Sequence, residues 1–165
     1  MKILLMRHGE AVDAEHGMSD GERWLTAKGR RLSREVASLV VEHTRPAAVW
    51  TSPLVRATQT AEILVSAAKL EDHVSVVREI ATGDVDAIVK KIRAYEGEAP
   101  LAIVGHEPTL STLVMTLLDE RKWHGFEKSA VCALTLKRGE SHARFDWMQL
   151  AKKLKLVEDL HKLVG

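Results

Sequence analysis

The sequence predicts one α/β domain built on a mostly parallel sheet. Three observations lead to this fold class: apolar runs too short for helices, helical periodicity between them, and the alternation of the two along the chain. The chain has 165 residues, of which 45% are hydrophobic and 28% charged. This length and composition are typical of one globular domain, which we expect over residues 1–165.

The strands are predicted from the apolar runs. Residues 2–6 form a run typical of a strand covered on both faces. Three later runs have the same character: residues 47–50, 74–77 and 101–104. Residues 130–136 and 143–147 are joined by a turn-like segment, which predicts an antiparallel pair closing one edge of the sheet.

Helices are predicted between the strands, where apolar residues recur at helical spacing. Thr26 is the expected N-cap of a helix of roughly 16 residues. Ser52 followed by Pro53 indicates a second helix start, with proline at the first helical position, and this helix should run to about Ala68. Further helices are predicted over residues 85–95, 108–118 and 149–164.

Residues 7–24 contain three glycines and little periodicity, so they predict a long loop that could cover a site as a lid.

Charge and composition exclude several classes of protein. The formal net charge is +1 and the basic residues are spread along the chain, so the electrostatic pattern of a nucleic-acid binder is missing. No stretch approaches the ~20 apolar residues of a membrane span. The single cysteine, Cys132, lies in an apolar run and predicts a buried, inert thiol without a disulfide framework. We therefore expect a cytoplasmic protein without nucleic-acid or membrane partners.

Polar clusters follow three of the predicted parallel strands. They are residues 7–9, 52–56 and 105–106, and the carboxyl edge of an open α/β sheet is where ligands bind. Arg7 and Arg56 each offer a planar fork of donors that matches a phosphoryl group. The helix start near Pro53 adds positive potential. The sequence therefore predicts a phosphate-binding pocket.

These segments also resemble a known family. LMRHGE at residues 5–10, TSPLVRATQTA at 51–61 and IVGHEP at 103–108 resemble the signature segments of the histidine-phosphatase superfamily, which includes phosphoglycerate mutases. RWLTAKG at residues 23–29 and FDW at 145–147 resemble its short members of the SixA type, which are phosphohistidine phosphatases. The resemblance spans nearly the whole chain and implies a three-layer α/β/α, phosphoglycerate mutase-like fold.

The resemblance implies a role for each matching residue. His8 is the expected nucleophile, Arg7 and Arg56 hold the phosphoryl oxygens, and His106 completes the pocket and stabilises developing charge. Physical chemistry agrees, because a neutral imidazole presents a lone pair to phosphorus while fixed cations neutralise the oxygens. Water then hydrolyses the phosphohistidine on His8, and no metal or cofactor is expected.

The proton donor to the leaving group stays open. Glu79 resembles the acid position of the mutase branch, whereas Glu10 and Glu107 lie near the histidines in sequence and have structural roles as an alternative. In a phosphohistidine substrate the distal ring nitrogen can already hold a proton, so imidazole leaves neutral. An alkyl phosphate needs an acid instead.

The leading hypothesis is a phosphatase acting on phosphohistidine in a protein. The alternatives are a phosphatase of small phosphate monoesters and a non-catalytic phosphate-binding module. Mutase activity is disfavoured because the short chain leaves little covering structure over the site. The other histidines lack metal-ligand spacing and are predicted to lie at the surface: His16, His43, His73, His124, His142 and His161.

Overall fold

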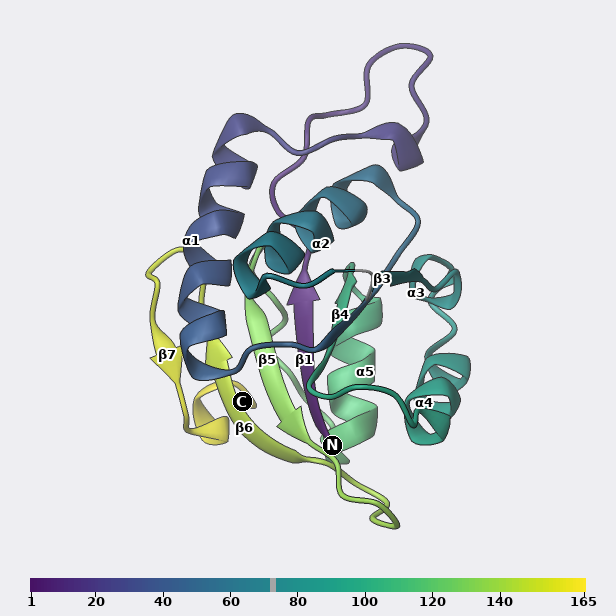
Figure 1. Cartoon of the computed structure of the whole chain (residues 1–165), viewed down its shortest axis with the longest axis vertical. Coiled ribbons are helices and arrows are strands. Elements are labelled where there is room, and N and C mark those ends of the chain that lie inside the picture. Colours follow the sequence, from purple (N-terminus) through teal and green to yellow (C-terminus); the bar gives the residue numbers. More distant parts are fainter. Residues whose placement is uncertain (72–73) are drawn as a thin grey trace.

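A computed structural model describes residues 1–71 and 74–165, so His73 lies outside the described residues. In this part of the chain seven strands form one mixed sheet in the order β3-β2-β4-β1-β5-β6-β7 (Figure 1). The strands are β1 (Lys2–Arg7), β2 (Ala48–Thr51), β3 (Val74–Val76), β4 (Leu101–Gly105), β5 (Val131–Thr135), β6 (Arg144–Gln149) and β7 (Leu156–Val157). Strands β3, β2, β4 and β1 pair in parallel, and β5 to β7 extend the sheet antiparallel. The predicted fold class, with its parallel sheet centre, is confirmed.

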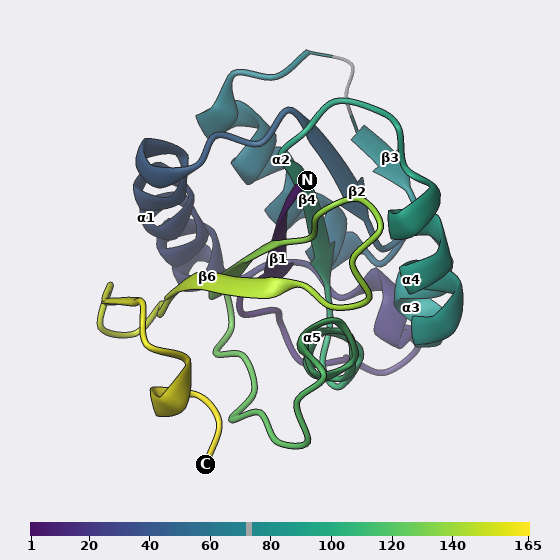
Figure 2. The same ribbon diagram turned by 90° about the horizontal axis from the view of Figure 1, so that it is seen from below.

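Helices cover both faces of the sheet, which gives three layers (Figure 2). Helices α1 (Ala27–His43) and α2 (Val55–Ala68) lie together on one face, whereas α3 (Glu79–Thr82), α4 (Val85–Ala94) and α5 (Thr109–Leu118) lie on the other. Two short 3-10 helices complete the elements: η1 (Asp20–Glu22) and η2 (Leu160–Lys162). Among the described residues, we find no helix with the length and hydrophobicity of a transmembrane span.

The starts of α1 and α2 differ in how they are capped. Thr26 caps α1 as predicted, because its hydroxyl accepts a hydrogen bond from the Gly29 amide at 2.9 Å. Helix α2 begins at Val55, two residues later than Pro53. Leu54 is its N-cap, with an extended backbone and no side-chain capping bond. The buried Ser52 hydroxyl accepts from the Leu54 amide at 3.3 Å and contacts His106 at 2.7 Å, so Ser52 belongs to the site.

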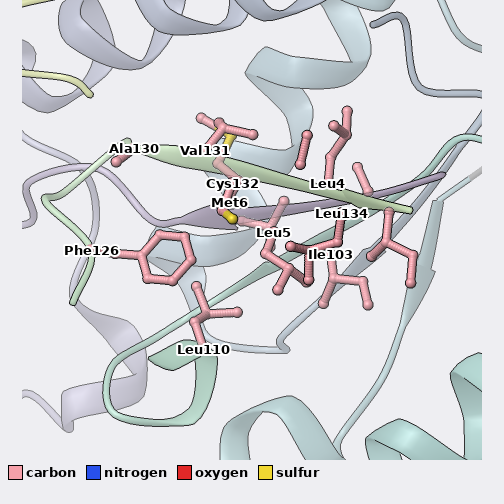
Figure 3. Packing of buried hydrophobic residues seen from close by; sticks show 14 of the residues in the cluster. Leu4, Leu5, Met6, Ile103, Leu110, Phe126, Ala130, Val131, Cys132 and Leu134 are labelled. Carbon is pink, nitrogen blue, oxygen red and sulfur yellow. The ribbon is translucent and has the colours of Figure 1, made fainter. Parts of the chain in front are cut away.

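The core lies around β1, whose central residues are fully buried. Figure 3 shows Leu5, Ile103, Leu110 and Phe126 among the side chains of this buried core. Burying a side chain of this size contributes about 1.5–3 kcal/mol to folding. Cys132 is buried in the same core, and burial raises the pKa of its thiol, so the predicted inert thiol is confirmed.

The predicted helix over residues 149–164 is wrong. Gln149 ends β6, the chain turns, and β7 pairs with β6 in an antiparallel ladder before η2. The Glu127 carboxylate fixes this turn by accepting hydrogen bonds from the amides of Ala151 and Lys152 at 3.0 and 2.9 Å. The backbone of this segment bonds to the open edge of β6 and to this carboxylate. These hydrogen bonds stabilise the observed path more than a helix would, although the leucines have helical spacing.

The path of the chain determines where the site forms. The chain leaves β1 towards α1 on one face of the sheet and leaves β4 towards α5 on the other face. Strands β1 and β4 are neighbours, with Arg7 paired to Gly105. A crevice opens at such a switch point, at the carboxyl ends of the strands. The next residues, His8 and His106, therefore lie side by side in this crevice.

Candidate active site

Four of the predicted residues meet at this crevice. His8 and His106 follow β1 and β4, and their ring centroids are 5.1 Å apart. Arg56 comes from the first turn of α2, and its Nε lies 3.3 Å from His8 Nε2. Arg7, the last residue of β1, is close enough for its charge to act on both histidines. His8, Arg56 and His106 are only 8%, 7% and 8% exposed.

The hydrogen bonds of His8 define its protonation state. Its Nδ1 lies 2.7 Å from the carbonyl oxygen of Gly9, which can only accept, so Nδ1 holds the proton. The other ring nitrogen, Nε2, accepts from the Arg56 Nε–H. A neutral His8 thus presents an unprotonated Nε2 towards the arginine that the sequence assigns to the phosphoryl group.

Burial keeps this imidazole neutral. The pKa of His8 falls to about 3, first because burial penalises the charged ring, and further because His106, Arg56 and Arg7 are nearby. The Gly9 carbonyl opposes the shift only in part. Burial likewise lowers the pKa of His106 to about 4. Both rings are therefore neutral near pH 7, so each keeps one nitrogen with a free lone pair.

Arg56 also contacts the loop between β1 and α1. Its Nη1 donates to the Asp20 carbonyl oxygen at 2.7 Å, and its Nη2 donates to Asp20 Oδ2 at 2.9 Å. Hydrogen bonds from Arg23 and Arg56 lower the pKa of Asp20 below its usual range, so the carboxylate is ionised at neutral pH. The predicted lid loop therefore touches the site through Asp20.

Two buried nitrogens at the base of the site lack hydrogen-bond partners among the described residues. Arg7 Nη1 donates to the Phe126 carbonyl oxygen at 2.6 Å, and His106 Nε2 pairs with Ser52 Oγ. Arg7 Nε and His106 Nδ1 are buried and have no hydrogen-bond partner among the described residues. Buried unpaired polar atoms cost free energy. The unpaired N–H of the Arg7 guanidinium beside the buried His8 fits a site that receives an anionic ligand.

Arg56 and His106 line an open cleft of about 380 Å³. Its walls include Asp20 and Leu54, the α3–α4 turn, and the start of α5. Among the lining residues are two carboxylates, and both have partners. Asp20 pairs with Arg56, and Glu107 Oε1 accepts from the Phe126 amide at 3.1 Å.

Glu79 is the first residue of α3, near the cleft wall formed by Ala81, Thr82 and Gly83. Its carboxylate lies 3.3 Å from Lys91 Nζ. A backbone hydrogen bond and this lysine lower the pKa of Glu79, which favours the ionised form. Glu10, the third candidate, accepts from the Thr26 hydroxyl at 3.0 Å and thus has a structural partner.

The remaining described histidines lie at the surface, as predicted. His16, His43, His124, His142 and His161 are exposed. Within residues 1–71 and 74–165 no three His, Cys, Asp or Glu side chains are grouped as a metal site. Sequence reasoning missed the contacts of Asp20 and Ser52 and gave no role to Thr60. For Thr60 a signal exists, because it lies one helical turn after Arg56 and therefore on the same face of α2.

Comparison with known proteins agrees with this geometry. Residues 3–87 match the model of the histidine phosphatase superfamily (branch 1). Phosphohistidine phosphatase SixA of Escherichia coli K12 is 30% identical over 162 residues, which cover 96% of this chain and 99% of SixA. The chain belongs to the histidine phosphatase superfamily.

Further relatives and solved structures extend the comparison. A protein of Picosynechococcus is 38% identical over 116 residues, which cover 67% of this chain and 68% of the relative. The structure of the histidine phosphatase SixA complexed with tungstate superimposes with a TM-score of 0.85 at 31% identity, covering 94% of this chain and 100% of that chain. The α-ribazole phosphatase of Shigella flexneri, at 16% identity and a TM-score of 0.69, shares the fold.

Proposed function

We propose that this member of the histidine phosphatase superfamily hydrolyses phosphohistidine in proteins. The observation that carries the proposal is the neutral, buried His8, whose unprotonated Nε2 faces the Arg56 guanidinium. Similarity to SixA over nearly the whole chain supports the same substrate class. We propose His8 as the nucleophile, Arg7 and Arg56 as phosphoryl ligands, and His106 as a donor to a phosphoryl oxygen.

The reaction has two displacements at phosphorus. In the first, His8 Nε2 forms a bond to phosphorus while the bond to the leaving nitrogen breaks, and the guanidinium groups stabilise the charge on the equatorial oxygens. In the second, water attacks phosphorus, the bond to Nε2 breaks, and inorganic phosphate leaves. The proton on Nδ1 stays with His8 throughout, held by the Gly9 carbonyl, so the ring departs neutral.

The carboxylates of the cleft favour a P–N substrate. Asp20 is ionised and paired with Arg56, and Glu107 Oε1 is bonded to a backbone amide. An alkyl phosphate needs a proton for its alkoxide, whereas a phosphohistidine protonated on its distal nitrogen releases neutral imidazole. The leaving group therefore brings the proton that the enzyme would otherwise supply.

Hydrolysis of small phosphate monoesters is the second candidate. The α-ribazole phosphatase shares the fold, and a fold does not by itself determine the substrate, which keeps this candidate open. In this candidate Glu79, two residues before the cleft wall, would be the proton donor. It would have to exchange its contact with Lys91 for one with the leaving group.

Under either activity, we propose that residues 1–165 work as one domain in the cytoplasm, without a metal, a nucleic-acid partner or a membrane partner. A single buried cysteine and a net charge of +1 support these points. Treatment with EDTA should leave turnover unchanged. Loss of activity that added metal restores would contradict the mechanism.

The deciding experiment is kcat/KM on a histidine-phosphorylated carrier protein and on a panel of small phosphate monoesters, with His8→Ala as the control. A strong preference for the carrier protein supports the proposal. Equal or better ester turnover would favour the second candidate. Unchanged activity in His8→Ala would contradict the assignment of the nucleophile.

A further inference from the structure

A buried hydroxyl connects the two halves of the site. Thr60 lies one turn after Arg56 on α2 and is fully buried. Its Oγ1 donates to the Arg56 carbonyl oxygen at 2.7 Å and accepts from the Gly9 amide at 3.0 Å. We propose that Thr60 is a positioning residue, which fixes the backbone beside the nucleophile against the helical turn that holds Arg56.

Gly9 transmits this contact to His8. Its amide is bonded to Thr60, and its carbonyl oxygen accepts from His8 Nδ1 at 2.7 Å. If the Thr60 hydroxyl is removed, the Gly9 amide becomes a buried donor without a partner. This costs free energy, which the backbone can lower by rotating towards another acceptor. Rotation of the Gly9 carbonyl releases the Nδ1 proton, which can then move to Nε2 and block the attacking lone pair.

The chemistry of both displacements depends on this tautomer. The inference rests on the proposed function, in which Nε2 forms and later breaks the bond to phosphorus while Nδ1 keeps its proton. The same hydroxyl also sets the distance from His8 to Arg56, since it bonds to the backbone of Arg56 itself. Thr60 therefore positions the nucleophile and a phosphoryl ligand together without touching the substrate.

Thr116 offers a matched control. Its hydroxyl makes the same bond to a carbonyl one turn earlier, from Oγ1 to Thr112 O at 2.8 Å, which is common for threonine in helices. Thr116 is exposed on α5, whereas the bond between Thr60 and Gly9 joins residues 51 positions apart. Thr116→Val thus removes the local bond alone.

The test compares Thr60→Val, which removes the hydroxyl at similar volume, with Thr60→Ser, which keeps it. We expect kcat to fall between about tenfold and a hundredfold in Thr60→Val with KM little changed, as for a misplaced reacting group. The kcat values of Thr60→Ser and Thr116→Val should stay within about threefold of that of the starting protein. Nitrogen-15 NMR of the imidazole should show one Nδ1–H tautomer of His8 in the starting protein and a mixture in Thr60→Val.

The proposal would be overturned if folded Thr60→Val kept the kcat of the starting protein and a pure Nδ1–H tautomer of His8. It would also be overturned if kcat fell as much in Thr60→Ser as in Thr60→Val. If Thr60→Val does not fold, Thr60→Cys takes its place, because a thiol is a weak hydrogen-bonding group. An intermediate fall in kcat then supports the proposal, and no fall overturns it. The NMR readout needs no substrate, so failure of the proposed function is separable from failure of this inference.

Discussion

Asp20 and Arg56 form an ion pair at the mouth of the cleft, with Oδ2 and Nη2 2.9 Å apart. The Asp20 carbonyl oxygen accepts from Nη1 of the same guanidinium. Both terminal nitrogens of Arg56 are thus bonded to the loop, and its Nε is bonded to His8. A phosphoryl group that binds Arg56 must share or displace the Asp20 carboxylate.

Asp20→Asn should therefore strengthen the binding of inorganic phosphate, because it removes a negative charge that competes for Arg56. The Asp20 side chain is largely exposed, so we expect a gain of no more than about fivefold, in line with the ~1 kcal/mol of exposed ion pairs. Competitive inhibition by phosphate measures this gain. Asp13→Asn, at an exposed position of the same loop, is the control. Weaker phosphate binding in Asp20→Asn would contradict the prediction that the Asp20 carboxylate competes with phosphate for Arg56.

Folding stability should decrease as the pH falls below 7. The folded-state pKa of His8 is about 3 and an unfolded histidine titrates near 6.5, so the unfolded chain binds the extra proton between these values. For His8 alone, we expect the free energy of unfolding to fall by about 2 kcal/mol from pH 7 to pH 5. Urea unfolding of the starting protein and of His8→Asn at both pH values measures this difference. An equal decrease in both proteins would contradict it.

Gly29→Ala should destabilise the fold and impair the site. A β-carbon at Gly29 would lie 2.1 Å from the Glu10 carbonyl oxygen, a backbone atom in the segment that follows His8. Relief requires this backbone to move, and such overpacking costs about 1–3 kcal/mol. Gly21→Ala is the matched control, because its nearest neighbour would lie at an ordinary 3.4 Å. Thermal unfolding and kcat should both change in Gly29→Ala, and neutrality there would contradict the close approach.

Glu79→Gln distinguishes the two candidate functions. If the leaving imidazole brings its own proton, Glu79→Gln should turn over the phosphohistidine substrate within about twofold of the rate of the starting protein. The substitution should reduce ester hydrolysis by about a hundredfold if Glu79 acts as an acid there. A large loss on the phosphohistidine substrate would show that the enzyme supplies a proton in that reaction as well.

The sequence allowed us to predict that the histidines and Arg56 lie together, because His8 and His106 follow strand ends. Once β1 and β4 are recognised as parallel neighbours, His8 and His106 must lie together, and Arg56 follows from the helix after β2. The contact of Asp20 with Arg56 could not be predicted, since it depends on how an aperiodic loop folds back across the sheet.

Residues 149–164 show where prediction from the sequence failed. Its leucines and lysines have helical spacing, yet the backbone amides of Ala151 and Lys152 bond to a carboxylate 24 and 25 residues earlier. Hydrophobic periodicity reflects the local preference of a segment for helix or strand. An open strand edge and a hydrogen-bond acceptor distant in sequence become available only in the assembled fold.

The most direct test of the account is to trap the phosphorylated intermediate. The protein is mixed with a histidine-phosphorylated carrier protein, quenched under alkaline conditions that preserve phosphohistidine, and mapped by peptide mass spectrometry. We expect one phosphoryl group on His8, at Nε2 by phosphorus NMR, and none in His8→Ala. Turnover by the starting protein without any phosphorylated His8, or with the phosphoryl group on His106, would contradict the mechanism.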